Sequence, residues 1–292
     1  MIAHVKYLAV SDTHFGRKTG DEALFRNNVQ KLVDRVHEEN PDELVLVGDI
    51  IDALYSEDFE ENIHRDLFFK LIDSCDDVVY VPGNHDIIYK EQGELGRAKI
   101  FYPYYIKDKI MFIHGHQFDI FHVFPFRYRD LNRVLDFVDR FWEFCPLIFE
   151  EIETAYSDRG AEEVERIKKD LVAMRARTFA RVISRIFMRM IMRGELEEMS
   201  SSTFTLLSIV MPKVFRGEPF YSQNPGVLDR KMNEYGRNWA SEDFDTICYG
   251  HIHNPLLLRG TYFSFANCGY VSDNMTSYAV LDGEGHMRVE KL

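Results

Sequence analysis

The sequence has few cysteines, no long apolar run and no excess of positive charge. Its four cysteines (Cys75, Cys145, Cys248 and Cys268) form no Cys-x-x-Cys pair, and a chain of 292 residues needs no disulfide to stabilise its core. We therefore expect four free, buried thiols in a reducing cytoplasm. The apolar runs are too short to cross a bilayer, and the first residues lack the basic and apolar regions of a secretory signal.

Repeats and low-complexity tracts are also missing, and the formal net charge is −13. With 46% hydrophobic and 14% aromatic residues, the composition is that of an ordinary globular protein and is too apolar for disorder. The acidic balance argues against a protein that coats nucleic acid through bulk charge, although a local basic patch could still bind it.

The first part of the chain alternates short apolar runs with amphipathic stretches. Helical spacing of apolar residues predicts helices over 21–39 and 58–74. Short apolar runs predict buried strands at 5–10, 44–47, 78–81 and 109–113. This rhythm is typical of a layered α/β fold with a sheet buried on both faces.

Residues 117–240 interrupt this rhythm, and the strand pattern returns after them. The interruption predicts helices over 131–144, 161–193, 195–210 and 226–240. The strands expected after it lie at 244–249, 256–258, 261–266, 276–281 and 286–291. The simplest organisation is an α/β core of residues 1–116 plus 241–292, with a helical insertion of residues 117–240 between its halves.

Polar side chains directly follow five of the predicted strands. They are Asp12 and His14, then Asp49, then Asn84, His85 and Asp86, then His114 and His116, and finally His251 and His253. Because ligands bind outside the carboxyl ends of strands in open α/β sheets, we expect these side chains to converge at one edge. In extended chain, Asp-x-His and His-x-His each aim two ligands to the same side. Six of the eleven histidines lie in these segments, and the pattern indicates a metal site.

Five blocks of the sequence resemble, in order, the motif series of the calcineurin-like metallophosphoesterases. The blocks are Asp12-x-His14, Gly48-Asp49-x-x-Asp52, Gly83-Asn84-His85-Asp86, His114-Gly115-His116 and Gly250-His251-x-His253. The resemblance implies a layered β-sandwich flanked by helices. It covers the two halves of the core and not the insertion.

The resemblance also implies a two-metal hydrolase. By resemblance, one ion would be held by Asp12, His14 and His253, the second by Asn84, His114 and His251, and both by the bridging Asp49. Mn²⁺ is the expected ion, with Fe or Zn as alternatives, and a hydroxide between the ions would attack phosphorus in line. His85 would contact the phosphate and protonate the leaving oxygen, and Asp86 is a candidate to orient His85.

Three further residues near these motifs have simpler interpretations that the sequence leaves open. Asp52 could cap the following helix, and at most it supports the site from behind the ligands. His116 could contact substrate or could be an exposed loop residue. Asn267 resembles a family loop near the site, but a plain turn explains it equally well.

The insertion combines aromatic residues with positive charge. Residues 117–150 contain ten aromatics, which could form the insertion's own core, an apolar pocket or a dimer face. Residues 166–193 contain nine basic residues and one acidic residue. These could pair with neighbouring acidic segments, or bind phosphates, anionic headgroups or a lipid surface. Arg177 and Arg181 are the candidate substrate contacts in this segment.

An aromatic, basic insertion at this place is similar to that of the UDP-2,3-diacylglucosamine pyrophosphatase branch of the family. That branch has Asn-Arg-Asp and His-Gly-Asp where this chain has Asn84-His85-Asp86 and His114-Gly115-His116. The insertion of this chain is also long.

We predict a hydrolase of phosphate ester, phosphodiester or pyrophosphate bonds. Its substrate would be a phosphorylated small molecule or a lipid-linked one, such as a nucleotide-sugar lipid, selected by the insertion. The alternatives are a nuclease of the same superfamily, whose basic helix would guide a backbone, and a non-catalytic interaction scaffold. We expect a cytoplasmic protein that could contact the membrane through the insertion.

Overall fold

A computed structural model describes most of the core and a short part of the insertion. The described residues are 4–53, 59–116, 153, 160–172, 244–259, 264–282 and 286–292. The chain divides into two compact units, Met1–Phe118 with Pro225–Leu292 and Asp119–Asn224. Apart from one helix, the helices predicted for 117–240 lie outside the described residues, so the domain boundaries stay a prediction.

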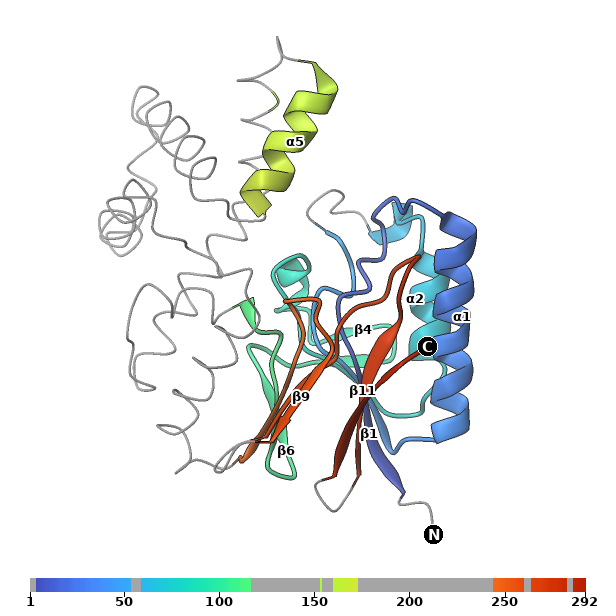
Figure 1. Cartoon of the computed structure of the whole chain (residues 1–292), viewed down its shortest axis with the longest axis vertical. Coiled ribbons are helices and arrows are strands. Elements are labelled where there is room, and N and C mark those ends of the chain that lie inside the picture. The colour runs from blue at the N-terminus through green and yellow to red at the C-terminus, as the bar shows by residue number, and fades with distance from the viewer. Residues whose placement is uncertain are drawn as a thin grey trace, which may run out of the picture. The chain divides into compact units, whose positions relative to one another are not determined.

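The larger sheet of the first unit has seven strands in the order β12-β11-β1-β2-β3-β5-β4 (Figure 1). Its strands are β1 (Val5–Val10), β2 (Glu43–Leu46), β3 (Val78–Tyr80), β4 (Glu94–Leu95), β5 (Ala98–Ile100), β11 (Ser277–Asp282) and β12 (Met287–Lys291). Strands β1, β2, β3 and β5 are parallel, and β11 joins β1 in the antiparallel sense. The parallel strands therefore send their carboxyl ends to one edge of the sheet.

The smaller sheet has five strands in the order β6-β7-β8-β10-β9. Its strands are β6 (Tyr105–Lys107), β7 (Ile110–Phe112), β8 (Thr246–Tyr249), β9 (Leu256–Arg259) and β10 (Ser264–Asn267). Strands β7, β8 and β10 are parallel, although more than a hundred residues separate the first two. This pairing unites the two halves of the core.

Side chains of the central strands point alternately to the two faces of the larger sheet, and both faces are buried. On β1, Tyr7 and Ala9 pack in a cluster with Phe112 and Cys248 of the smaller sheet. The intervening Leu8 joins a second cluster that contains the buried faces of the helices. Since successive side chains point to opposite faces, one apolar strand can serve both cores. The predicted layered α/β fold is thus confirmed, with the smaller sheet on one face and helices on the other (Figure 1).

Helix α1 (Glu22–Glu39) covers the helical face of the larger sheet, with Leu32 and Val36 in its buried stripe. It begins at Asp21, whose carboxylate accepts a hydrogen bond of 3.0 Å from the Leu24 amide. It ends at Asn40 in the left-handed conformation, whose amide donates to the Val36 carbonyl oxygen at 2.9 Å. The helix predicted over 21–39 is confirmed.

Helix α2 (Arg65–Ile72) is shorter than the helix predicted over 58–74. Residues Phe59–Glu61 form a separate 3-10 turn, η1. Between them, the Asn62 side chain accepts from the His64 amide at 2.9 Å and donates to the Phe15 carbonyl oxygen at 2.9 Å. An asparagine that hydrogen-bonds locally in this way competes with a continuous helix, and this explains the break.

Three short strands, β4, β5 and β6, were not predicted. They have two or three residues each and extend the two sheets at their edges. A second 3-10 turn, η2 (Ile87–Tyr89), follows the end of β3. Runs this short carry no readable alternation of apolar and polar residues.

Helix α5 (Ala161–Val172), in the second unit, is the described part of the helix predicted over 161–193. Arg166 pairs with Glu163 at 2.6 Å, and Lys168 pairs with Glu153 at 2.5 Å and with Glu165 at 3.3 Å. The two basic residues therefore pair with acidic neighbours, one of the two interpretations that the sequence left open. The rest of the basic segment lies outside the described residues, as do the aromatics of 117–150.

Cys75, Cys248 and Cys268 are free and buried, as predicted, and Cys145 lies outside the described residues. Within the described part of the chain, no helix combines the length and the apolarity needed to cross a membrane.

Candidate metal centre

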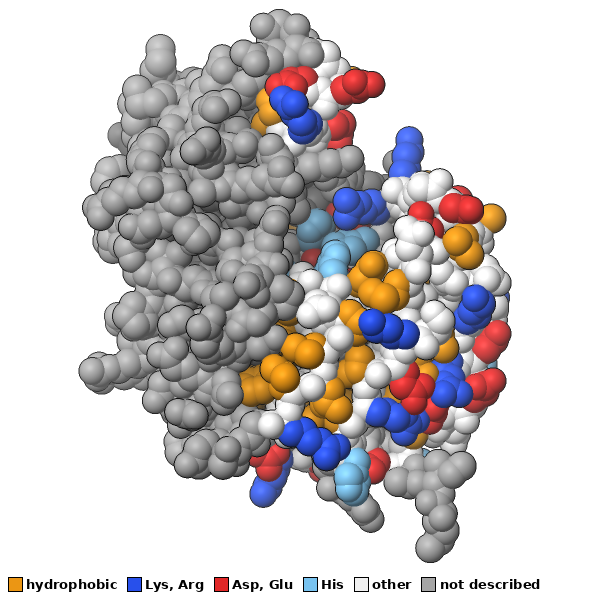
Figure 2. Space-filling view, viewed as in Figure 1, with side chains coloured by type: hydrophobic (Ala, Val, Ile, Leu, Met, Phe, Trp, Pro, Cys, Tyr) orange, Lys and Arg blue, Asp and Glu red, His pale blue; other side chains and the backbone are white. Residues whose placement is uncertain are grey.

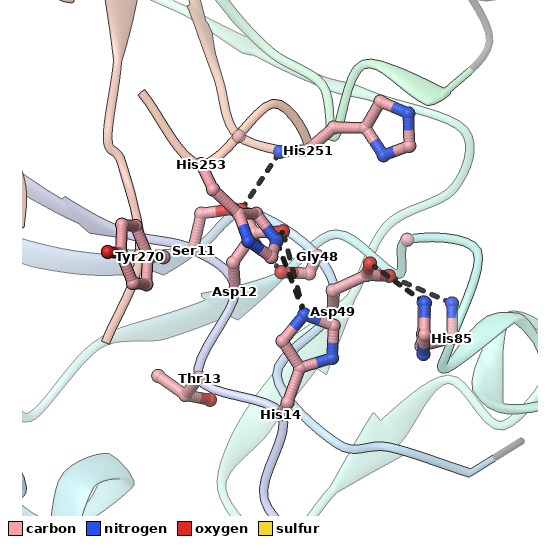
Figure 3. Close-up of polar contacts among 12 residues, drawn as sticks. Ser11, Asp12, Thr13, His14, Gly48, Asp49, His85, His251, His253 and Tyr270 are labelled. Atoms are coloured by element: carbon pink, nitrogen blue, oxygen red, sulfur yellow. Dashed lines mark hydrogen bonds and ion pairs between the residues drawn. The ribbon is translucent and has the colours of Figure 1, made fainter. Parts of the chain in front are cut away.

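The site is built from loops that leave the carboxyl ends of strands in both sheets. Backbone hydrogen bonds join these loops, from the Asp12 amide to Gly48 O (3.0 Å) and from the His14 amide to Asp49 O (3.0 Å). A third, from the Gly250 amide to His114 O at 2.9 Å, joins the loops of the smaller sheet. The predicted convergence of side chains at one sheet edge is therefore what the structure shows (Figure 3).

Tight backbone turns aim these side chains. Five of the predicted metal ligands have a positive φ of 48–67°, a conformation uncommon for residues other than glycine. They are Asp12, His14, Asp49, His251 and His253. Such conformations cost of order 1–3 kcal/mol each and persist where the surrounding structure fixes them, often at functional sites.

Asp12, His14 and His253 form one group, in which single ligand atoms all lie within 4.8 Å of one another. His253 Nε2 is 3.0 Å from Asp12 Oδ1 and 3.4 Å from His14 Nε2. Figure 3 shows the two histidine rings pointing toward each other from different loops. Tyr270 stacks on the His253 ring with centroids 5.2 Å apart, which orients this partly exposed histidine.

Asp49, His114 and His251 form a second group within the same limit of 4.8 Å. His114 Nε2 lies 3.2 Å from Asp49 Oδ2, while His114 Nδ1 donates to the Val47 carbonyl oxygen at 2.9 Å. Because a carbonyl oxygen only accepts, Nδ1 carries a proton, and in the neutral ring, the form that binds a metal, Nε2 has the lone pair. Asp49 also shares a third group with His14 and His85, so it lies between the other two sets.

Several ligand atoms are buried without a hydrogen bond. Among the described residues, Asp12 Oδ1, Asn84 Oδ1 and His114 Nε2 have no such partner, although Asp12 and His114 lie at ion-pair distance from other ligands. An unpaired buried polar atom costs about 1–3 kcal/mol and needs an explanation. Lone pairs that approach one another without hydrogen-bond geometry fit a shared cation, and oxygen and imidazole donors suit divalent metals.

The pKa shifts of Asp49 and His114 agree with a site for divalent cations. Burial alone would raise the pKa of Asp49, but the charges of His114, His85 and His14 hold it well below its usual value. Burial alone would lower the pKa of His114, but the negative charge of Asp49 raises it. The net result is a pKa of about 10 in the absence of metal. Asp49 therefore stays an anion at neutral pH and can attract two cations.

The sequence matches the profile described as calcineurin-like phosphoesterase over residues 5–172, which is more than half of the chain. The chain belongs to the calcineurin-like phosphoesterase family. Family membership and the two Asp/His groups together identify a binuclear divalent metal site in a metal-dependent phosphoesterase.

Solved structures similar to this calcineurin-like phosphoesterase cover nearly the whole chain at low identity. A novel archaeal phosphodiesterase is 12% identical over 98% of this chain and 99% of its own, with a TM-score of 0.40. A dimetal phosphatase from Danio rerio is 11% identical over 99% of this chain and 96% of its own, with a TM-score of 0.44. No curated protein gives a significant match. These likenesses are too weak to carry any assignment, and the resemblance to the UDP-2,3-diacylglucosamine pyrophosphatase branch stays a prediction.

Asp52 has a larger part in the site than the sequence indicated. It is buried, and its Oδ1 accepts from His85 Nδ1 at 3.0 Å, while its Oδ2 lies 3.7 Å from His14 Nδ1. Burial alone would lower the pKa of His85, but the negative charges of Asp49 and Asp52 raise it. The net result without metal is a pKa of about 9. The spacing Gly48-Asp49-x-x-Asp52 was the available signal, but the sequence alone could not show which histidine Asp52 contacts.

Asp86, in contrast, does not orient His85 in the way we expected. Its Oδ2 accepts from the Ile50 amide at 2.6 Å and from the Tyr80 hydroxyl at 2.5 Å, and its Oδ1 accepts from the Gly83 amide at 2.5 Å. Asp86 therefore fastens the loop after β3 to the loop after β2. Among the described residues, the carboxylate that accepts a hydrogen bond from His85 Nδ1 is that of Asp52, while Asp49 Oδ2 lies 3.8 Å from Nε2.

His116 is buried rather than exposed, with 1% of its surface accessible. Its ring centroid lies 5.4 Å from that of His114 and 6.2 Å from that of His251. Neither ring nitrogen has a hydrogen-bond partner among the described residues. This removes the interpretation as an exposed loop residue and leaves substrate contact as a prediction.

Asn267 and Ser11 support the site from behind the ligands. The Asn267 side chain donates to Gly250 O at 2.8 Å and accepts from the Gly269 amide at 2.8 Å, so it braces the loop that bears His251. The Ser11 hydroxyl donates to Asp12 Oδ2. Arg177 and Arg181 lie outside the described residues.

Proposed function

We propose that the chain hydrolyses phosphate ester, phosphodiester or pyrophosphate bonds with two divalent metal ions. The observation that carries this proposal is the convergence of buried carboxylate, amide and imidazole atoms that lack hydrogen bonds, at an edge shared by both sheets. When bound, the two ions would polarise the phosphoryl oxygens and supply a water nucleophile of lowered pKa.

The two Asp/His groups support a division of residues between two ions, and the buried Asn84 Oδ1, which has no hydrogen bond among the described residues, is a further candidate ligand. One ion would be held by Asp12, His14 and His253, the other by Asn84, His114 and His251, and Asp49 would contact both. The Mn²⁺ expected from the resemblance, with Fe or Zn as alternatives, suits this mixed set of oxygen and nitrogen donors.

His85 would act on the leaving group. With Nδ1–H donated to Asp52, its other nitrogen, Nε2, lies 3.8 Å from Asp49 Oδ2 and faces the site. Without metal, the charges of Asp49 and Asp52 raise the pKa of His85 to about 9. Asp52 is not among the proposed ligands, so its hydrogen bond to Nδ1 would continue to favour the protonated ring that a general acid requires. His85 would bind the phosphate and pass the proton of Nε2 to the leaving oxygen.

Substrate choice would belong to the insertion and to His116. We propose a phosphorylated small molecule or a lipid-linked one, such as a nucleotide-sugar lipid, with Arg177 and Arg181 as contacts. An insertion of this kind could also bring the protein to a membrane surface from the cytoplasm.

The function is tested with the full chain on bis-p-nitrophenyl phosphate, after chelation and again after adding Mn²⁺. We expect turnover only with metal, no turnover for Asp49→Asn, and a fall of about 10²-fold or more for His85→Ala with the metals still bound. His4→Ala, which removes an exposed histidine that pairs with Asp42, should behave like the wild type. Turnover that survives chelation would overturn the proposal.

A substrate panel then decides among bond types. It includes p-nitrophenyl phosphate, nucleotide sugars, phospholipids, and single- and double-stranded DNA and RNA. Faster cleavage of nucleic acid than of any small substrate would replace the proposal with the nuclease alternative. The absence of turnover on every substrate with any divalent ion would favour the non-catalytic scaffold.

A further inference from the structure

The loop that bears the predicted ligand His14 is held from two sides. On one side, the His14 amide donates to Asp49 O at 3.0 Å, in the loop after β2. On the other side, the Gly16 amide donates to the ring nitrogen Nδ1 of His64 at 3.0 Å. His64 directly precedes α2 and is not among the predicted ligands. A side chain outside the ligand set therefore helps to hold the loop of a ligand.

Both ring nitrogens of His64 have partners, and these partners fix the tautomer. A backbone amide can only donate, so Nδ1 has a lone pair, and the proton of the neutral ring is on Nε2. Nε2 lies 2.9 and 3.0 Å from the two carboxylate oxygens of Glu22, in the first turn of α1. Burial alone would raise the pKa of Glu22, but hydrogen bonds from His64 and Arg26 lower it. The carboxylate is therefore an anion that accepts a hydrogen bond from Nε2.

The ring of His64 is completely buried, whereas the site itself reaches solvent. The His64 side chain is 0% exposed, and its ring centroid lies 4.9 Å from that of Phe25 and 6.3 Å from that of Phe15. The predicted ligand His253 is 41% exposed, and Figure 2 shows histidine side chains at the surface. A ring buried in this way is out of reach of a substrate, so its effect on the site would pass through the loop.

The loop needs support because its backbone has an uncommon conformation. Asp12 and His14 have φ of 55° and 48°, and Gly16 has φ of 106°. Residues other than glycine keep a positive φ only where the surrounding structure fixes it. Loss of the hydrogen bond to the Gly16 amide would let the loop relax. His14 Nε2 would then leave its place 3.4 Å from His253 Nε2.

We propose that His64 is a positioning residue for the ion that His14 would help to hold, and that it acts through the Gly16 amide. The proposal rests on the proposed function and deepens it, because one of the two ions then depends on a residue that binds neither. Loss of a partner that orients a metal ligand typically weakens metal binding by about 10–100-fold. The ion assigned to His114 and His251 has its ligands on other loops, so its affinity should not depend on His64.

The test is a Mn²⁺ titration of the metal-free full chain, followed by calorimetry, with two variants that keep different halves of the imidazole. The shorter amide of His64→Asn can keep an acceptor for the Gly16 amide at the place of Nδ1, but it loses the contact with Glu22. The longer amide of His64→Gln can keep a donor for Glu22, but it loses the acceptor. We expect His64→Gln to weaken one ion about tenfold and to leave the other unchanged, and His64→Asn to bind both nearly as the wild type does.

A second background identifies the ion that is affected. In His253→Ala, which already weakens the ion shared with His14, adding His64→Gln should cause no further loss, because both changes act on the same ion. A further loss there would overturn the proposal. The matched control for damage to α2 is Ser74→Ala, which removes a hydrogen bond to Leu71 O at the other end of this helix. It should bind both ions as the wild type does.

Nitrogen-15 NMR of the wild type tests the geometry without any variant. At neutral pH we expect a lone pair on His64 Nδ1 and the proton on Nε2, and a proton on Nδ1 would overturn the proposal. Equal weakening of both ions by His64→Gln, weakening of neither, or the same loss in His64→Asn would overturn the role of His64 alone. A wild type that binds fewer than two ions and hydrolyses no substrate would overturn the proposed function as well.

Discussion

At the scale of single residues, the site depends on carboxylates that hold histidines in one orientation. Asp52 is 1% exposed and hydrogen-bonds Nδ1 of His85, so it fixes both the tautomer and the direction of Nε2. It also lies within 3.7 Å of His14 Nδ1. Mutation of a side chain that hydrogen-bonds a metal ligand or reacting group from outside typically lowers metal affinity or activity by about 10–100-fold.

Asp52→Asn should lower kcat about tenfold or more while KM changes little, because the amide keeps the shape of the side chain but not its charge. The pKa of His85 in metal-free protein should fall below about 9, since the Asp52 charge is one of the two that raise it. NMR titration of the His85 ring measures this shift. Asp66→Asn, which neutralises an exposed acid paired with Arg26, should leave kcat and the His85 pKa unchanged.

At the scale of elements, the turns after the strands bring the ligands together. Gly48 has φ +77°, and a Cβ there would lie 2.5 Å from Cγ and Nδ1 of His114. Gly93 has a similar φ of +74°, but a Cβ there would meet nothing within 4 Å. The two glycines therefore separate the cost of a left-handed backbone from the cost of close approach to a ligand.

Gly93→Ala should lower the free energy of unfolding by about 1–2 kcal/mol, the usual cost of a side chain in this conformation. Gly48→Ala should cost about 2 kcal/mol more and should also weaken metal binding, because His114 must move. Chemical denaturation and metal analysis measure the two effects. Equal destabilisation by both changes would contradict the account of the turn after β2.

The elements also show where sequence reasoning succeeds. Apolar runs such as those of β1 and β2 predict their strands, and the polar residues that follow these two strands predict part of the site. The two-residue strand β4 carries no such pattern. The contact of Asp52 with His85 depends on a loop geometry that spacing does not specify, and the Asn62 side chain that shortens α2 acts through a backbone carbonyl 47 residues away.

At the scale of the whole molecule, a network of polar side chains joins helix α1 to strands β11 and β12 at one edge of the larger sheet. Arg35 donates to the Tyr278 hydroxyl at 2.7 Å and to Glu290 at 2.9 Å, and Arg288 also pairs with Glu290 at 2.5 Å. Burial would raise the pKa of Glu290, but hydrogen bonds from the Tyr278 hydroxyl (2.5 Å), Arg35 and Arg288 lower it to about 2 from 4.5. The stability that this carboxylate contributes is therefore present above pH 4.5 and is lost as the pH falls from there toward 2.

Glu290→Gln should flatten the fall of the unfolding temperature between pH 4.5 and 2, because the amide does not take up a proton. Thermal unfolding followed by circular dichroism across this range measures the slope. Glu38→Gln is the matched control, since Glu38 also pairs with Arg35 but is 65% exposed, and its slope should stay close to that of the wild type. An unchanged slope in Glu290→Gln would rule out this source of acid sensitivity.

The two halves of the core together supply the residues proposed to hold two metal ions. The most direct measurement titrates metal-free protein with Mn²⁺ and follows bound metal and hydrolysis of bis-p-nitrophenyl phosphate together. We predict that binding saturates at two ions per chain and that activity reaches its maximum at the same point. Saturation at a single ion, or full activity before any metal is added, would contradict the account.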